Sequence, residues 1–424
     1  MPLYKRKKVK KSLFRKSRVH NNDDNIMQSK KSSRVSSSVI PQKDIRVLKG
    51  SQINRKKRTV FFLGVTAIVC ATLILLSAIL PVGVYENIVN ISAASGAGKY
   101  PIEMNEEAVL NTISNDSYYF VLTDLKIIAY SNSGKVILND MHGFANPVIS
   151  VSQTRALVYD QGGKIAYIYN LGGKIHTVET KNEIITASIS RSGSFAIATD
   201  SDNYTSVVDV YDKKFKKIFT WNSAKDIVNN VLINPSGNKL AVTTLNAVSN
   251  QFTSKMYILN FESADPIFTL DLDNSIAVSL LNTGKGISVV SKDSYKFVHW
   301  KKHTTSEVSV PCEINILRNS KNGLLFVCNR ANDRSDNTVF LISSKGKKQN
   351  EIKINTLITD IQYSKGRIYY ISDTNVEILD SEGNVLRKSN CNYGTERFAV
   401  IAPNSIATVN ESEILKVEIH KGEN

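Results

Sequence analysis

A tight polar turn followed by a short apolar run recurs eight times from about residue 107 to the end of the 424-residue chain. Runs such as Phe195–Thr199 and Leu324–Val327 have the length of short buried strands. The turns are centred near residues 116, 154, 193, 237, 284, 323, 366 and 404. Their mean spacing of about 41 residues, with room for four short strands per unit, is typical of β-propeller blades. We therefore predict an all-β fold, an eight-bladed β-propeller, with a seven-bladed ring as the alternative if the first or last unit is partial.

The eighth unit holds only three predicted strands, at 398–401, 406–409 and 414–419. A candidate for the fourth lies at the other end of the repeats, in Tyr100–Met104, which belongs to no unit. Its Pro101 suits an outer edge strand, where one N–H group need not be paired. We therefore expect this segment to complete the last blade and to close the ring, which removes the open edges of a linear array.

Residues 59–85 form an apolar run without a single charged side chain. About 20 apolar residues suffice for a helix to cross a hydrocarbon core ~30 Å thick. The alternative is a cleaved signal peptide, whose apolar region spans roughly 7–15 residues behind a short leader. Here the run is almost twice as long and follows 58 residues, so we predict one N-terminal transmembrane helix.

The net charge of +16 lies entirely in residues 1–58, which hold 19 Lys and Arg against three acids. The remaining chain sums to zero, which excludes a basic nucleic-acid-binding globule, and we expect no sequence-specific nucleic-acid contact. Arg55, Lys56, Lys57 and Arg58 directly precede the apolar run, so the positive-inside rule places the N-terminus in the cytoplasm. We assign these four residues to topology and to contact with anionic lipid.

The predicted organisation is therefore a single-pass protein of the cell membrane. It comprises a basic disordered cytoplasmic tail (1–58), a transmembrane helix (59–85), a linker (86–98) and an extracytoplasmic propeller (99–424). The role of the tail beyond topology and the oligomeric state stay open at this point.

Motifs that would indicate catalysis or a metal site do not occur. The six histidines form no H-E-x-x-H pair, and His299 and His303 are expected on a strand and the turn after it. The acidic loops 200–203 and 332–337 loosely resemble calcium loops, but they lack the sixth-position Gly and the closing Glu. We expect solvated hairpin loops there, and we predict no catalytic residue, no metal ligand and no cofactor.

Three cysteines follow the apolar run, Cys312, Cys328 and Cys391, while Cys70 lies within it. An odd number does not imply a full disulfide framework. We expect free buried thiols, since Cys packs as a small apolar side chain. One Cys312–Cys391 bridge between neighbouring blades is the alternative.

The segment Leu157–Lys164 reads LVYDQGGK and follows Asn146–Pro147. Together with the basic tail and the apolar run, this pattern resembles a family of membrane-anchored propellers of unknown function from low-GC Gram-positive bacteria. The resemblance covers roughly residues 50–420 and implies no known catalytic residue. The repeats are also similar to quinoprotein-like and tryptophan–aspartate-repeat propellers, but Trp221 and Trp300 are the only tryptophans, and neither Gly-His nor Trp-Asp occurs.

These features favour a non-enzymatic interaction scaffold whose partner is an extracytoplasmic protein or a cell-wall glycan. Propeller loops gather on two faces around a channel and offer broad docking surfaces. The alternative is a propeller enzyme or cofactor carrier with a site on one face. A cluster of Asp, Glu and His side chains converging at a mouth of the channel would favour that alternative.

Overall fold

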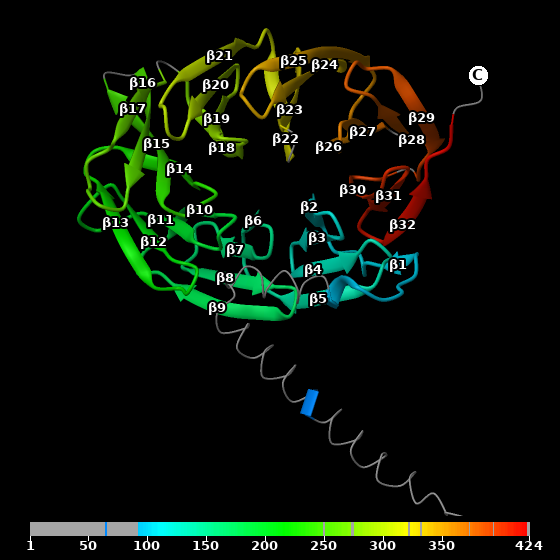
Figure 1. Cartoon of the computed structure of the whole chain (residues 1–424), viewed down its shortest axis with the longest axis horizontal. Coiled ribbons are helices and arrows are strands. Elements are labelled where there is room, and N and C mark those ends of the chain that lie inside the picture. The colour runs from blue at the N-terminus through cyan, green and yellow to red at the C-terminus, as the bar shows by residue number, and fades with distance from the viewer. Residues whose placement is uncertain are drawn as a thin grey trace, which may run out of the picture. The chain divides into compact units, whose positions relative to one another are not determined.

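The structure, a computed structural model of the chain, describes residues 64–65, 92–248, 251–272, 275–320, 323–330, 333–372, 374–392 and 394–421. Within residues 92–421, the described strands form eight antiparallel sheets of four strands, arranged side by side as a closed ring (Figure 1). The predicted eight-bladed β-propeller is therefore confirmed, and the seven-bladed alternative is wrong. Seven of the eight turn markers lie between the first and second strands of a blade, as the repeat predicted, and the eighth, Gly323, is the first residue of the second strand β23 (Gly323–Arg330).

The first strand of each blade lies innermost and the fourth outermost. Blade 1 consists of β2 (Val109–Ser114), β3 (Tyr118–Thr123), β4 (Lys126–Ser131) and β5 (Val136–Met141), and blade 2 of β6 (Pro147–Val151), β7 (Ala156–Asp160), β8 (Ile165–Asn170) and β9 (Gly173–Glu179). Blade 3 consists of β10 (Ile184–Ile189), β11 (Phe195–Thr199), β12 (Ser206–Tyr211) and β13 (Lys217–Ser223), and blade 4 of β14 (Ile227–Ile233), β15 (Lys239–Val248), β16 (Gln251–Asn260) and β17 (Phe268–Asp271).

Blade 5 consists of β18 (Ala277–Thr283), β19 (Gly286–Ser291), β20 (Ser294–His299) and β21 (Thr305–Ser309). Blade 6 consists of β22 (Glu313–Ser320), β23 (Gly323–Arg330), β24 (Asp333–Ser343) and β25 (Lys348–Asn355), and blade 7 of β26 (Asp360–Ser364), β27 (Arg367–Ser372), β28 (Asn375–Leu379) and β29 (Val385–Asn390). Blade 8 consists of β30 (Arg397–Ala402), β31 (Ser405–Val409), β32 (Glu413–Glu418) and β1 (Ile102–Glu103).

The second strands are buried on both sides because each blade is covered by its two neighbours. In β3, Tyr119 and Val121 pack with side chains of blade 8, such as Ala399. Phe120, between them, points the other way and packs with Val158 of blade 2. Because successive side chains of a strand point to opposite faces, one strand contributes to two interblade cores. This explains why these strands read as continuous apolar runs.

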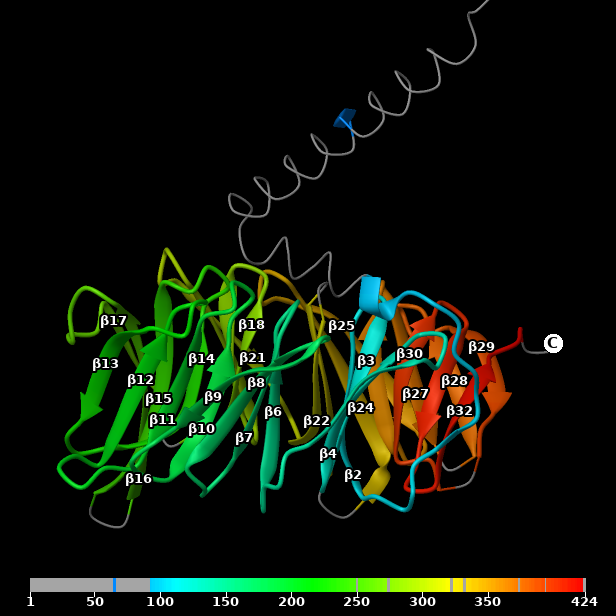
Figure 2. The same ribbon diagram turned by 90° about the horizontal axis from the view of Figure 1, so that it is seen from below.

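The ring has two faces with different connections, and Figure 2 shows it edge-on. We call the face with the turns between strands 1 and 2 and between strands 3 and 4 the turn face. The loop face carries the loops between strands 2 and 3 and the connections from one blade to the next. From residue 93 on, the predicted linker packs on the turn face, because Lys135 Nζ donates to the carbonyl oxygens of Ala93 (3.1 Å) and Ser95 (2.8 Å).

Polar side chains, of which Asp360 and Gln362 are buried and Arg318 and Ser114 partly buried, join the innermost strands of blades 6, 7, 8 and 1. Arg318 of β22 forms an ion pair with Asp360 of β26 at 2.6 Å, and Asp360 also accepts from the N–H of Phe398 in β30. On the blade 1 side, Ser114 donates to Gln362 at 2.9 Å and accepts from the N–H of Val400 at 3.1 Å. These groups are satisfied only when neighbouring blades are in place, so they specify the alignment of the ring.

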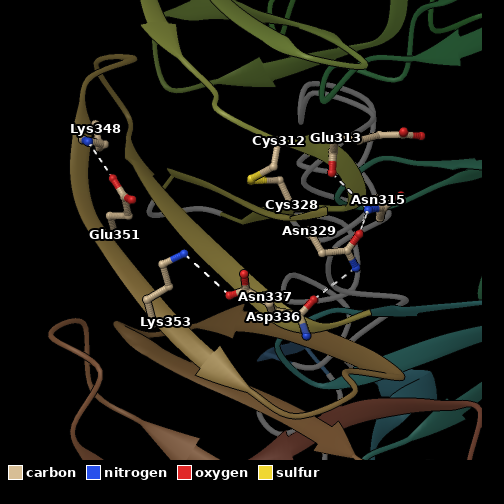
Figure 3. The surroundings of a disulfide bond; sticks show 10 residues. All are labelled: Cys312, Glu313, Asn315, Cys328, Asn329, Asp336, Asn337, Lys348, Glu351 and Lys353. Carbon is tan, nitrogen blue, oxygen red and sulfur yellow. Dashed lines mark hydrogen bonds and ion pairs between the residues drawn. A yellow bond between two sulfur atoms is a disulfide. The ribbon is translucent and has the colours of Figure 1, made fainter. Parts of the chain in front are cut away.

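One disulfide joins Cys312, just before β22, to Cys328 in β23 (Figure 3). The predicted free thiols at these positions are wrong, and so is the Cys312–Cys391 alternative. The reason lies in the register inside blade 6: Ile314 pairs with Cys328, which brings the Cα of Cys312 to 5.5 Å from that of Cys328. Cys391 is free and buried, as predicted, and burial raises the pKa of its thiol.

The N-terminal strand β1 closes the ring. Ile102 pairs with Ile414 and Glu103 with Glu413 of β32, and the N–H of Met104 donates to the carbonyl of Ser412. Met104 is 2% exposed and packs in the core between blades 8 and 1. The predicted completion of the last blade by the segment near residues 100–104 is confirmed.

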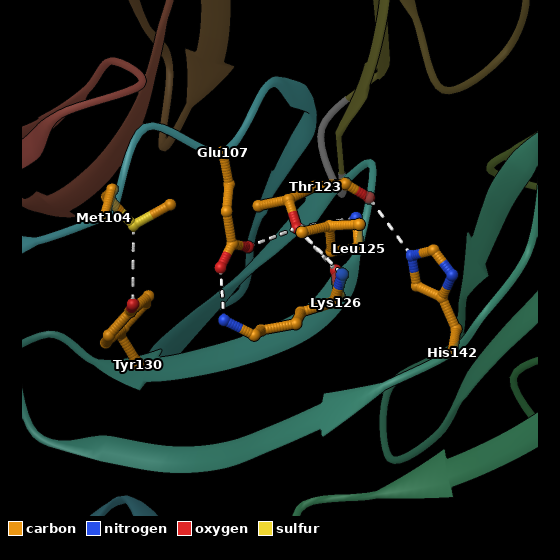
Figure 4. Close-up of polar contacts among 7 residues, drawn as sticks. All are labelled: Met104, Glu107, Thr123, Leu125, Lys126, Tyr130 and His142. Carbon is orange, nitrogen blue, oxygen red and sulfur yellow. Dashed lines mark hydrogen bonds and ion pairs between the residues drawn. The ribbon is translucent and has the colours of Figure 1, made fainter.

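The chain continues from β1 into a buried polar contact that fixes it to blade 1 (Figure 4). Glu107 is buried, forms an ion pair with Lys126 of β4 and accepts a hydrogen bond from Thr123 Oγ1 at 2.7 Å. Tyr130 donates to the sulfur of Met104 at 3.6 Å, and burial, with Glu107 as the second cause, raises the pKa of Tyr130 to about 12. The closing segment is therefore tied to the first and the last blade together.

Among the described residues, no helix is both long and apolar enough to cross a membrane. The predicted tail and the predicted span lie outside the described residues, except for Gly64 and Val65.

Met104→Ala should destabilise the ring by about 2–4 kcal/mol, because it removes a buried side chain from the closure core and leaves a cavity. Thermal or urea unfolding of the full chain would measure this loss. Met141→Ala is the matched control, since Met141 is 65% exposed and should change stability by less than about 0.5 kcal/mol. Equal stability of the two variants would contradict a closing role for β1.

The disulfide predicts a specific pattern of alkylation. Unfolded without reductant, the full chain should take up an alkylating reagent only at Cys70 and Cys391, whereas prior reduction should open Cys312 and Cys328 as well. Closing a 16-residue separation stabilises a fold by up to about 3 kcal/mol, so reduction should also lower the melting temperature. Intact mass would count the modified cysteines and peptide mapping would locate them, and modification at all four cysteines without reductant would refute the pairing.

Candidate functional site

The predicted topology residues Arg55, Lys56, Lys57 and Arg58 lie outside the described residues. The candidate site described by the structure lies in the propeller.

Three histidines of the propeller, His142, His299 and His303, make contacts within the fold. His142 is buried, and its Nδ1 accepts from the N–H of Phe144 at 3.1 Å, so its Nε2 carries the proton and donates to the carbonyl of Thr123. His299 Nδ1 accepts from two backbone N–H groups of the turn that follows β20. His303 lies in that same turn and stacks on Phe268; burial lowers its pKa. His299 and His303 thus lie on a strand and the next turn, as predicted.

The two acidic loops are engaged in side-chain contacts. In the first, Asp202 accepts from Lys181 at 2.6 Å and from Asn182 at 3.0 Å, and these hydrogen bonds lower the pKa of Asp202. Near the second, Asp336 lies 3.7 Å from Lys353. Nowhere in the part of the chain that the structure describes do three His, Cys, Asp or Glu side chains gather as metal ligands.

Exposed apolar side chains are concentrated on the loop face. Phe252 is 56% exposed at the β15–β16 hairpin, and Val278 is 64% exposed at the start of β18. Most of these side chains belong to blades 3 to 5. We call the five exposed apolar side chains of these blades on the loop face the apolar group: Tyr204, Ile227, Phe252, Ile276 and Val278. Exposed apolar side chains from neighbouring blades on one face can contribute to a contact surface for another molecule.

A groove of about 740 Å³ opens beside these side chains, between blades 3 and 4. One wall is formed by residues 222–226, which run from the end of β13 into the connection to β14. The other consists of Asn246, Asp271 and four residues of β16: Thr253, Ser254, Lys255 and Tyr257. The long β15–β16 hairpin raises the second wall above its neighbours, since each of its strands has ten residues.

Two aromatic rings form the floor of the groove. Trp221 and Tyr257 lie 5.7 Å apart between ring centroids, tilted by 47°. The indole N–H of Trp221 donates to the carbonyl of Ala264 at 3.1 Å, and the side chain is only 8% exposed. Trp221 therefore supports the floor without offering a free ring face. Burial, with the charge of Asp226 as the second cause, raises the pKa of Tyr257, so its hydroxyl stays protonated at neutral pH.

The polar groups of the groove are held in place by one another. Asp226 accepts from Asn246 Nδ2 at 2.8 Å and from the Thr244 hydroxyl at 3.4 Å. Lys255 lies 3.5 Å from Asp271 in an exposed ion pair. A preformed groove with paired charges and amide groups can bind a polar chain, and nothing in these contacts sets up a nucleophile or a general base.

Sequence reasoning missed this groove, although one signal pointed to it. The spacing from the turn at 237 to that at 284 is the longest of the eight-unit series, and the extra residues form the β15–β16 hairpin. The position of that hairpin opposite the 222–226 connection follows only from the ring geometry.

Comparison with solved structures supports the fold alone. The computationally designed Ika8 protein is similar with a TM-score of 0.54 at 12% identity, over 76% of this chain and 100% of that one. Sqt1 of Saccharomyces cerevisiae gives 0.54 at 10% identity, over 76% and 100%. The C-terminal WD40 domain of Sif2 gives 0.52 at 11% identity, over 77% and 100%. No curated protein matches the chain.

A family model matches residues 93–419, which span every described blade of the ring from the segment before β1 to the end of β32. The chain therefore belongs to the family of unknown function DUF5711.

Proposed function

We propose that this protein is a single-pass, membrane-anchored extracytoplasmic scaffold that binds a protein partner through the loop face. The observation that carries the proposal is the apolar group around the groove on that face. In this proposal the propeller has no enzymatic role.

Two features support an extracytoplasmic location. The apolar run 59–85 behind Arg55–Arg58 has the length and flanking charge of a signal anchor. The Cys312–Cys328 disulfide is of the kind that persists in oxidising surroundings and is rare in the cytosol.

The place where the linker contacts the ring supports the choice of face. Residues 93–98 are held on the turn face by Lys135 and by Ser133, which accepts from the N–H of Gly98 at 3.2 Å. A tether attached there leaves the loop face free on the other side of the ring. A large partner can then reach the loop face without meeting the membrane.

The chemistry of the loop face favours protein over glycan. Sugar rings stack on exposed aromatic faces, and in the groove itself Trp221 is buried and bonded through its N–H, so the exposed rings of the face are those of Tyr204 and Phe252 outside the groove. Exposed aliphatic side chains such as Ile227 and Val278, together with the aromatic ring of Phe252 and polar groups, resemble the centre of a protein interface. The enzyme or cofactor-carrier alternative is disfavoured because the carboxylates of the groove are already paired.

Photo-crosslinking in growing cells tests the proposed face. A photoreactive residue in place of Phe252 or Val278 should give one discrete protein adduct, because both side chains lie in the proposed contact. The same residue in place of Val136 or Val385, exposed apolar positions at the turn-face end of outer strands, is the matched control. Adducts of equal yield at all four positions, or glycan adducts alone, would contradict the proposal.

Protease added to intact cells tests the proposed topology. It should digest the propeller and spare the tail in the native protein. Replacing Arg55, Lys56, Lys57 and Arg58 by neutral residues should give mixed or inverted insertion, since about 4 kcal/mol of attraction to an anionic inner leaflet is lost. Removal of the tail with survival of the propeller would mean that the orientation is reversed.

A further inference from the structure

The two faces of the propeller carry opposite charge, although the chain beyond residue 58 is neutral as a whole. The turns of the turn face hold more basic than acidic residues. The described basic ones are Lys135, Arg155, Arg191, Lys213, Lys214, Lys216, Lys285, Lys301, Lys302, Lys345, Lys347, Lys365 and Lys421, and the acidic ones are Asp116, Asp212, Glu262, Asp265, Asp380 and Glu382. Apart from Lys135, Arg155 and Lys213, these basic side chains are exposed.

The loop face shows the reverse. Its described acidic residues, in the loops and blade connections, are Glu106, Glu107, Asp124, Glu183, Asp200, Asp202, Asp226, Asp293, Glu396 and Glu411. Its described basic ones there are Lys164, Lys181, Lys225 and Lys292. The propeller is therefore a charge dipole with the basic end on the turn face.

The tether keeps the basic face near the membrane. The predicted span ends at residue 85, and residues from Ala93 on are held on the turn face by Lys135. The chain between them, residues 86–92, reaches at most about 25 Å when fully extended. The attachment point on blade 1 thus cannot move far from the bilayer, and a modest tilt brings basic side chains within a Debye length of ~8–10 Å.

We propose that the turn face lies against the anionic phospholipid headgroups of the membrane in which the chain is anchored. This inference rests on the proposed anchor. The exposed lysines are spread over turns of blades 3, 5 and 6, with Lys214, Lys302 and Lys347 as examples, so each belongs to a separate turn. A wide, shallow distribution of charge fits an extended anionic surface rather than a small anion in a pocket. The acidic loop face is repelled by the same surface, so both faces favour one orientation.

Hydrogen exchange of the full chain in lipid nanodiscs tests this orientation. In discs with about one quarter phosphatidylglycerol, turns 212–216 and 300–304 should exchange at least about threefold more slowly than in phosphatidylcholine discs. The loops 200–204 and 224–226 of the loop face should exchange equally in both. Raising NaCl from about 0.1 M to about 0.5 M should remove the difference, since screening shortens the reach of the charges.

Charge reversal on each face provides matched variants. Lys214→Glu, Lys301→Glu, Lys302→Glu and Lys347→Glu together should abolish the slower exchange on the turn face. Lys164→Glu, Lys181→Glu, Lys225→Glu and Lys292→Glu make the same change in net charge on the loop face and should leave the slowing intact. Equal loss in both variants would overturn the proposal, because it would reflect net charge alone.

Two further outcomes would also overturn it. One is equal protection of the turn face in both lipid compositions, which would mean proximity without charge recognition. The other is protection by soluble polyphosphate in phosphatidylcholine discs but none in phosphatidylglycerol discs, which would assign the face to a soluble polyanion. The fourfold Lys→Glu variant of the turn face should still give the protein crosslinks from positions 252 and 278. A failure of the lipid-contact proposal can therefore be told apart from a failure of the proposed partner binding.

Discussion

The short antiparallel pairing between β1 and β32 is the contact on which the rest of the ring depends. It covers the outer edge of the last blade and places Met104 in the core that joins blades 8 and 1. The chain on both sides of β1 contacts blade 1. Before the strand, Ala93 accepts a hydrogen bond from Lys135, and after it, Glu107 forms an ion pair with Lys126. The same stretch of chain therefore closes the ring and decides which face the tether leaves from. A propeller closed by its C-terminal strand alone would leave that choice open.

Much of the fold could be predicted from the sequence because blade turns have strict chemical demands. Gly193 and Gly237 adopt positive φ, which few other residues tolerate, and they stand at the marker positions of blades 3 and 4. The missing strand of blade 8 could be predicted because the last unit holds only three strands where the other units hold four, and the segment near residues 100–104 belongs to no unit. The Cys312–Cys328 bond could not, since it depends on the β22–β23 register, which alternation of side chains alone does not determine.

The candidate binding face was less predictable for a related reason. Whether a loop residue lies on the turn face or the loop face depends on which connection of the blade holds it, and a composition averaged over the chain hides that. Asp226 and Lys214 are twelve residues apart, yet they lie on opposite faces because β13 runs between them. The neutral sum of the body therefore concealed two charged faces, and the groove between blades 3 and 4 needed the ring geometry to appear.

The two faces make sense together if one is reserved for the membrane and the other for a partner. Tyr204, Phe252 and Val278 would be a liability next to a bilayer, where exposed apolar groups can insert into lipid, but the acidic residues around them disfavour that approach. The same acids shape the partner. Asp200 and Asp202 lie on the same face in blade 3, so a partner wide enough to bury Phe252 and Val278 and to reach blade 3 would fit with an apolar centre and basic groups at its rim. Charge would then set the orientation at the membrane and the choice of partner on the other side, with the apolar group supplying the affinity.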